Sequence, residues 1–270
     1  MSVPPHSTRI GSPSPRLLAS LNLTDQEICT IIRCYLTIVF RNVGPNMDRQ
    51  LAERLSRQFK ISPEQIAREE SELLILDKLM ASRLGNVLVL KGGTALRLAY
   101  GSPRFSDDLD FSLLTPASES VFMHTAGSVA QAVPQVALVE ALSKHFTLFA
   151  LYRVHEPYLA HPFSIKVEVS TRQETWEREQ DLTLRLLTSP VTPISVLAQV
   201  ATLERMWSDK QSALAARRQP RDLYDLWFIA QKLRQPFTPD LSGFDRQAIR
   251  RELRKYLPAT HWQVIEQWSE

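Results

Sequence analysis

Three aspartates lie within four positions near the middle of the chain, at Asp107, Asp108 and Asp110. Carboxylates this close repel one another unless solvent, a cation or basic groups offset their charge. The residues that follow have the composition of a strand, whose side chains alternate between two faces. Asp108 and Asp110 are therefore expected on one face, and the apolar Leu109 and Phe111 on the other. Two carboxylates on one side of a strand are suited to a divalent cation.

A phosphate-binding turn is predicted just before these carboxylates. Val87–Leu90 is a short apolar run typical of a buried strand, and Gly92 and Gly93 interrupt it with residues that tolerate positive φ. Thr94 follows where a helix is expected to start, and Ala95–Tyr100 contains good helix formers. Free backbone N–H groups at a helix start, together with a hydroxyl group, favour an anion.

Each feature also has an ordinary structural explanation. Gly-Gly turns precede helices in many α/β proteins, and D-x-D sequences often lie at solvated strand ends. Their combination, with the turn first and the carboxylates on the next strand, points instead to a phosphate cradle that faces a metal site.

The sequence KGGTALRLAYGSPRFSDDLDF, Lys91 to Phe111, resembles the first motif of the AbiEii/AbiGii nucleotidyltransferase toxins. This group includes the MenT toxins and belongs to the DNA polymerase β-like superfamily. The resemblance implies a minimal catalytic α/β domain that uses a nucleoside triphosphate and Mg²⁺, as two ions, with Mn²⁺ as an alternative. Asp108 and Asp110 match the metal-binding carboxylates of that motif.

A third acidic residue is available on a later strand. The segment Phe163–Ser170 alternates, with Lys166 and Glu168 on one face and apolar residues on the other. In the nucleotidyltransferase superfamily a third carboxylate comes from a strand next to the D-x-D strand, and Glu168 matches it in kind and order. The alternative is a solvated strand end, where Lys166 and Glu168 form an ion pair worth at most ~1 kcal/mol.

A second motif follows in the helical half of the chain, where Lys210 precedes ARRQPRDLYDLWFI at residues 216–229. Pro220 suits the first turn of a helix, and Asp222 and Asp225 fall where the helix dipole favours acids, which is an ordinary explanation for both. The K-x6-R-x3-R-D-L-Y-D-L arrangement nevertheless resembles the second half of the AbiEii-type signature, whose lysine and R-D-x-x-D segment line the nucleotide pocket.

The two motifs together define the expected site. By the resemblance, the lysine of the second motif binds the triphosphate. The expected metal ligands are Asp108, Asp110 and Glu168, and the expected catalytic residues are these three with Lys210 and Asp222. Nucleotide or phosphate binding is expected for Lys91, Gly92, Gly93, Thr94, Ser106, Lys210, Arg217 and Arg221.

The predicted fold is α/β, or α+β: a minimal nucleotidyltransferase domain with a small mixed sheet, flanked by N-terminal helices and a C-terminal helical domain. Residues 1–20 are expected to be a mobile tail, 21–190 to hold the N-terminal helices and the catalytic domain, and 191–270 to complete the nucleotide pocket. Besides the first strand, strands are predicted at residues 109–114, 146–154, 163–170 and 182–188. Helices are predicted at residues 24–41, 47–59, 63–83, 118–144 and 242–257, and two more are predicted to begin near Ser195 and at Pro220.

Composition excludes some classes of protein. With 270 residues and 44% hydrophobic residues the chain can bury one good core or two modest ones, and it has no apolar run of the roughly 20 residues that a membrane span requires. Cys29 and Cys34 suit neither a redox pair nor a zinc site, so buried thiols of a cytoplasmic protein are expected. The six histidines show no metal-ligand spacing.

Charge is distributed unevenly along the chain. The net charge is only +3, but basic residues crowd the last quarter, which suits a polyanionic partner such as RNA. A solvated helix face is the ordinary alternative for this crowding. The N-terminal helices could also form a DNA-binding helix-turn-helix, but they lack a recognition helix rich in base-reading residues.

By resemblance to the MenT group, the acceptor is expected to be the 3′ end of tRNA. The added nucleotide is expected to be a pyrimidine nucleotide in most cases, and ATP, CTP and UTP are the candidate triphosphates. Added nucleotides would block aminoacylation and arrest growth, and an antitoxin would be encoded beside the toxin. Three alternatives stay open: transfer to a small-molecule or protein hydroxyl, kinase-like attack at the γ-phosphate, and a non-catalytic module that binds RNA or a partner.

Overall fold

The protein is described here by a computed structural model that covers residues 47–269, all of which lie in one compact unit, Gly44–Glu270. The predicted tail, the helix predicted at 24–41 and both cysteines lie outside the described residues. The helix predicted at 47–59 is α3, Arg49–Phe59, with Asp48 as its N-cap.

A seven-stranded mixed sheet forms the centre of the described part, in the order β3-β4-β5-β2-β1-β7-β6. β2 runs parallel to β5 and antiparallel to β1, and β1 runs parallel to β7. The strands are β1 Leu88–Lys91, β2 Asp108–Leu113, β3 Val136–Lys144, β4 Thr147–Val154, β5 Phe163–Ser170, β6 Leu182–Ser189 and β7 Thr192–Ala201. The predicted α/β class with a mixed sheet is confirmed.

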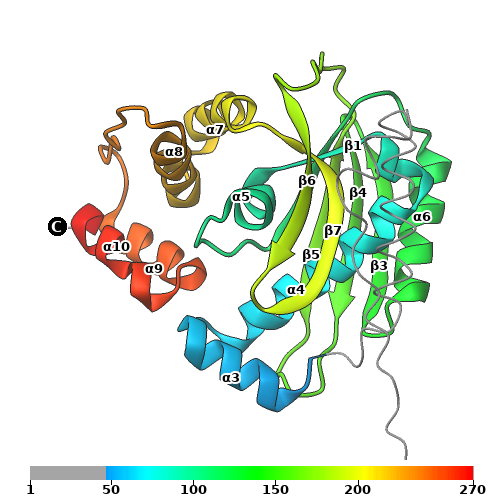
Figure 1. The fold of residues 1–270 in the computed structure, drawn as a ribbon, viewed down its shortest axis with the longest axis horizontal. Helices are drawn as coiled ribbons and strands as arrows, with labels where there is room; N and C mark the ends of the chain where they lie inside the picture. Colours follow the sequence, from blue (N-terminus) through cyan, green and yellow to red (C-terminus); the bar gives the residue numbers. More distant parts are fainter. Residues whose placement is uncertain (1–46, 270) are drawn as a thin grey trace, which may run out of the picture. The chain divides into compact units, whose positions relative to one another are not determined.

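Helices lie on both sides of this sheet, with α6 on one side and α5, α7 and α8 on the other (Figure 1). Pro63 and Pro220 each occupy the first turn of a helix, as predicted, and Ser62 caps the first of these two helices. Besides α3, the described helices are α4 Pro63–Ala81, α5 Gly92–Tyr100, α6 Glu119–Ala132, α7 Leu203–Arg217, α8 Pro220–Leu233, α9 Arg246–Tyr256 and α10 Trp262–Ser269, with short 3-10 helices at Arg83–Asn86 and Ala259–His261.

One apolar core holds the central strands in place. Leu109 and Phe111 of β2 and Val167 of β5 are buried in it together with Leu76 of α4 and Phe122 of α6. Because side chains alternate along a strand, burial of these residues turns the polar residues between them to the other face. The core therefore fixes which face of β2 and β5 carries the candidate site.

Two predicted helices are wrong in extent. The helix predicted through residue 144 ends at Ala132, and the segment after the turn at Pro134 is the edge strand β3. The helix predicted from near Ser195 begins at Leu203. Val196 and Val200 are four residues apart, which fits a helix, but they lie on strand β7, which pairs with β1 and β6. The sheet thus continues past residue 190, where the C-terminal helical domain was expected to begin.

Within residues 47–269, no helix combines the length and the apolar character that crossing a membrane demands.

The last basic helix is shorter than predicted. It was expected to begin at residue 242, but α9 begins at Arg246, after its N-cap Asp245.

Candidate active site

Asp110 lies at the centre of a row of side chains that crosses three strands. Its register partners are Lys91 on β1 and Glu168 on β5. Asp108, two residues earlier on β2, is paired with Lys166. Since register partners project to the same face of a sheet, the structure brings the three predicted carboxylates together on one face.

These carboxylates are oxygen ligands of the kind that Mg²⁺ prefers. Among residues 47–269, however, no group of three or more His, Cys, Asp or Glu side chains is placed to hold a metal ion. Asp108 Oδ2 lies 3.5 Å from Lys166 Nζ. The chemistry of Asp108, Asp110 and Glu168 fits a divalent cation, and their joint role as ligands stays a prediction.

The electrostatics of Asp110 also favour a cation. Burial raises the pKa of its carboxyl above the ordinary value, and the nearby charge of Lys210 opposes this rise without cancelling it. The charges of Asp108 and Glu168 raise the pKa further. The ionised carboxyl is thus destabilised in the protein alone, so a proton or a bound cation would stabilise the site.

The Gly-Gly turn packs directly against this row. Gly92 has a φ of +78°, and a Cβ at this position would lie 2.5 Å from Asp110 Oδ2. A Cβ at Gly93 would lie 2.7 Å from Ser106 Oγ and would collide with the guanidinium of Arg104. The turn forms the first residues of α5, whose N-cap Lys91 makes no side-chain capping bond. Gly92 therefore permits the close approach of the helix N-terminus to Asp110, and Gly93 permits its close approach to Arg104 and Ser106.

Thr94 differs from its prediction. The helix begins two residues before it, and its side chain is buried. The hydroxyl donates a hydrogen bond of 2.6 Å to the backbone carbonyl of Asp108, so it fastens α5 to β2. The hydroxyl that was expected to hold a phosphate is engaged inside the protein, which leaves the backbone N–H groups of the turn for that task.

The second motif gathers around Lys210. Its Nζ lies 2.9 Å from Asp222 Oδ1 and 2.6 Å from Asp225 Oδ2, and both carboxyl groups are fully buried. Arg217 donates two hydrogen bonds to Asp222, of 2.7 and 2.8 Å. Burial alone would raise the pKa of Asp222, but these bonds and the charge of Lys210 outweigh it and lower the pKa to about 2. The predicted residues Lys210, Arg217 and Asp222 thus converge, close enough for Lys210 to act on Asp110.

Two members of this cluster were not predicted as site residues. Arg104, only 3% exposed, donates from Nε and Nη2 to the two carboxyl oxygens of Asp225, each at 2.7 Å. Asp225 belongs to the R-D-x-x-D segment, which is the signal that could have identified it. Arg104 lies in the loop between the Gly-Gly turn and β2, and no periodicity marks it.

Arg221 and Lys91 end in different surroundings. Arg221 Nε lies 3.8 Å from Glu252 Oε1 on α9, so this side chain reaches away from the Lys210 cluster. Lys91 Nζ lies 3.8 Å from Asp209 Oδ2 on α7, beside the row that holds its register partner Asp110. Of the two, only Lys91 is placed next to the carboxylates.

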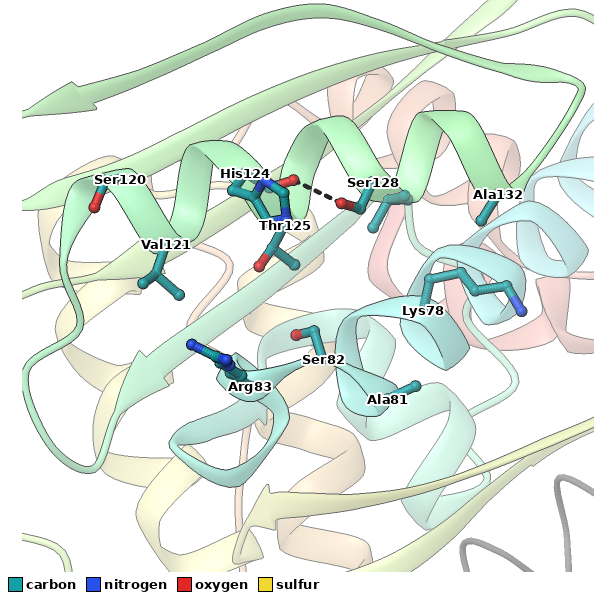
Figure 2. A pocket seen from close by; sticks show the side chains of 11 residues that line it. Lys78, Ala81, Ser82, Arg83, Ser120, Val121, His124, Thr125, Ser128 and Ala132 are labelled. Carbon is teal, nitrogen blue, oxygen red and sulfur yellow. Dashed lines mark hydrogen bonds between the residues drawn. The ribbon is translucent and has the colours of Figure 1, made fainter.

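A cavity lies elsewhere in the described residues. It has a volume of about 650 Å³ and is lined by residues of α6 and of the end of α4, among them Lys78, Ser82, Arg83, His124 and Thr125 (Figure 2). It contains no predicted site residue. The candidate site is thus defined by its carboxylates, its turn and its buried lysine.

A mixed sheet with carboxylates in register, a glycine turn at a helix N-terminus and a buried lysine beside them is the arrangement of a nucleotidyltransferase. The sequence model described as the nucleotidyl transferase AbiEii toxin of type IV toxin-antitoxin systems matches residues 74–266. The match includes both motifs and most of the chain. The protein belongs to the AbiEii family of nucleotidyltransferase toxins.

The fold is similar to that of a toxin of known structure. MenT4, a nucleotidyltransferase toxin from Mycobacterium tuberculosis H37Rv, is 21% identical over 83% of this chain and 87% of its own, with a TM-score of 0.55. JHP933 from Helicobacter pylori is 22% identical over 76% of this chain and 81% of its own, with a TM-score of 0.48. No curated protein sequence matches the chain significantly.

Proposed function

We propose that this nucleotidyltransferase is a toxin that transfers a nucleoside monophosphate, preferably a pyrimidine nucleotide, from a nucleoside triphosphate to the 3′ end of tRNA. The tRNA would then no longer be aminoacylated, and translation would stop. The observation that carries the proposal is the row of Asp110 and Glu168 in register, next to the Gly-Gly turn and within reach of the charge of Lys210.

The chain's own residues would bind and orient the triphosphate. Backbone N–H groups of Gly93 and Thr94 at the start of α5 would donate to phosphate oxygens. Lys210 places a fixed positive charge beside them. Asp108, Asp110 and Glu168 would hold Mg²⁺, which when bound lowers the pKa of the acceptor hydroxyl and offsets charge on the pyrophosphate.

The reaction itself is a displacement at the α-phosphorus. The acceptor hydroxyl oxygen forms a bond to this phosphorus and loses its proton to solvent. The bond from the α-phosphorus to its bridging oxygen breaks, and pyrophosphate leaves with the electron pair. Orientation and charge supply most of the catalysis in such a transfer, which is why positions of charged groups matter here more than covalent chemistry.

The proposal that tRNA is the acceptor rests on the family and on the basic residues of α9. α9 carries the exposed Arg246, Arg250, Arg251 and Arg254, although Arg250 and Arg254 are both bonded to Glu266, at 2.8 and 2.7 Å. Arg246 and Arg251 are thus the better candidates for contacts with an RNA backbone. A cytoplasmic location and a cognate antitoxin belong to the same proposal.

The test is to incubate the purified protein with Mg²⁺, bacterial tRNA and each α-³²P-labelled nucleoside triphosphate in turn, followed by a denaturing gel. Label on tRNA from one or two triphosphates, absent with Asp110→Asn, is the expected result. Label from γ-³²P-ATP would favour the kinase-like alternative instead. If no RNA is labelled while a protein or a small molecule is, the acceptor proposed here is wrong.

A further inference from the structure

Lys210 lies between two buried carboxylates that are held in the same way. Asp222 is bound through both oxygens by Arg217, and Asp225 through both oxygens by Arg104. The Lys210 ammonium contacts one oxygen of each, at 2.9 and 2.6 Å. Two arginine-carboxylate pairs therefore form a clamp around one lysine.

We propose that Arg104 is a positioning residue for Lys210, acting through Asp225. The inference rests on the proposed role of Lys210 at the triphosphate. A bidentate arginine fixes both the position and the rotation of a carboxylate, which a lysine at the same place would not do. When Asp225 is held in this way, the Lys210 ammonium has two rigid acceptors and keeps a single orientation.

Charge balance supports the same role. The clamp contains three cations, Arg104, Lys210 and Arg217, against two anions, Asp222 and Asp225, so one positive charge is left to act on groups outside the clamp. Each arginine neutralises one carboxylate, which leaves the charge of Lys210 to act on Asp110 and on a polyanionic ligand. Without Arg104, Asp225 would draw on Lys210 as its remaining cation in the cluster, and that surplus charge would be lost.

Arg104 also connects the two motifs. Its Nη2 lies against the Cβ position of Gly93 in the phosphate turn, and its Nη1 donates to the carbonyl of Phe105 at 2.9 Å. The same guanidinium thus sets the distance between the turn that receives the phosphates and the lysine that would neutralise them. Its three bonded nitrogens are engaged with protein acceptors, so contact with the nucleotide is not required for its effect.

The decisive variants are Arg104→Lys, which keeps the charge but loses the fork, and the double variant Arg104→Met with Asp225→Asn, which leaves no unpaired buried charge. Arg97→Met is the matched control. Arg97 is also a nearly buried arginine bound through two bonds to one carboxylate, Glu69, at 2.7 and 3.1 Å, but it does not contact the Lys210 clamp.

Binding of a fluorescent nucleoside triphosphate analogue and thermal unfolding would be measured for each variant without any acceptor. Both Arg104 variants are expected to bind the triphosphate at least tenfold more weakly, to bind the monophosphate within about twofold of wild type, and to melt no earlier than Arg97→Met. Arg97→Met should retain triphosphate affinity. Triphosphate affinity within twofold of wild type in both Arg104 variants would overturn the inference.

The outcomes separate this inference from the proposed function. If wild type binds the triphosphate but labels no RNA, the proposed acceptor fails, while the affinities still decide the role of Arg104. If Lys210→Met binds the triphosphate as tightly as wild type, Lys210 does not act there and the inference about Arg104 is wrong. A kcat that falls while KM stays unchanged in Arg104→Lys would likewise contradict a role in holding the lysine toward the ground-state triphosphate.

Discussion

The hydroxyl of Tyr256 on α9 donates a hydrogen bond of 2.5 Å to Oδ2 of Asp107, the residue directly before Asp108. Lys255 Nζ reaches the same oxygen at 2.9 Å, and the Phe105 amide donates to the carbonyl of Tyr256, also at 2.9 Å. Burial raises the pKa of Asp107, but the charge of Arg68 and the bonds from Tyr256 and Lys255 outweigh this effect and lower the pKa below its ordinary value. The C-terminal helices therefore fix the loop that leads into the carboxylate strand.

Tyr256→Phe should remove the hydrogen bond to Asp107 without leaving a cavity, because the aromatic ring is kept. Loss of the hydrogen bond is expected to lower the free energy of unfolding by about 1 kcal/mol, because the partly buried Asp107 carboxylate loses one donor. It should lower kcat/KM for nucleotide transfer several-fold, because Asp108 follows the loop. Urea unfolding and transfer rates measure the two effects.

Tyr152→Phe is the control for that change. The Tyr152 hydroxyl also makes a buried bond, to the carbonyl of Ala126 at 3.2 Å, but it lies against α6. Its loss should cost similar stability and leave transfer unchanged. Equal losses of kcat/KM in both variants would contradict a specific role for Tyr256.

Gly92→Ala should inactivate the enzyme. Its φ of +78° strains any L-residue, and the new Cβ would lie 2.5 Å from Asp110 Oδ2. Gly101→Ala, at a φ of +74° with nothing within 4 Å of the new Cβ, carries the same backbone strain alone. Both should lose about 1 to 2 kcal/mol of stability, and only Gly92→Ala should lose transfer, by at least about 100-fold. Transfer that survives in Gly92→Ala would show that the turn does not pack on the site.

Asp110→Asn and Asp222→Asn should change stability in opposite directions, although both should abolish transfer. The pKa of Asp110 is raised, so in EDTA its replacement should leave stability unchanged or raise it. The pKa of Asp222 is lowered to about 2 by Arg217 and Lys210, so its replacement leaves the buried Lys210 and the half-exposed Arg217 poorly paired and should cost about 3 kcal/mol. Thermal and urea unfolding compare the two.

The lowered pKa of Asp222 also makes its contribution to stability depend on pH. Asp222 binds fewer protons in the folded protein than in the unfolded chain between its ordinary pKa, near 4, and 2. Its contribution is therefore present above pH 4 and lost as the pH falls toward 2. Asp222→Asn should lose less stability than wild type over this window, and an equal loss would contradict the lowered pKa.

Glu156 should make the protein less stable as the pH rises. This carboxyl is 3% exposed, and burial, with the charge of Glu70, raises its pKa to about 7. The folded state therefore holds a proton between about pH 4.5 and 7 that the unfolded chain releases, so stability falls through this window. The loss is about 2 to 3 kcal/mol. Glu156→Gln should remove this loss of stability, which urea unfolding at pH 5 and pH 8 measures.

Glu140→Gln serves as the control for this pH effect, since Glu140 is exposed on the edge strand β3. It should keep the wild-type dependence on pH. A Glu156→Gln variant with the same slope as Glu140→Gln would mean that Glu156 is ionised in the folded protein at neutral pH.

The sequence by itself determined the parts that depend on local pattern. Alternation placed Asp108 and Asp110 on one face, and Glu168 on the polar face of its own strand, because a strand has a period of two whatever surrounds it. The glycine turn and Pro220 at a helix start follow from backbone sterics and a missing N–H, which are equally local. These features were sufficient to identify the family.

Only the tertiary structure decided what depends on residues far apart in the chain. Arg104 and Asp225 are separated by 121 positions, and Asp107 and Tyr256 by 149, so no local pattern links them. The apolar spacing of residues 192–201 fits a helix or a strand, and pairing with β1 and β6 selected the strand. Thr94 turned its hydroxyl inward because β2 offers it a carbonyl. Packing and long-range hydrogen bonds choose among states that the local sequence leaves nearly equal in free energy.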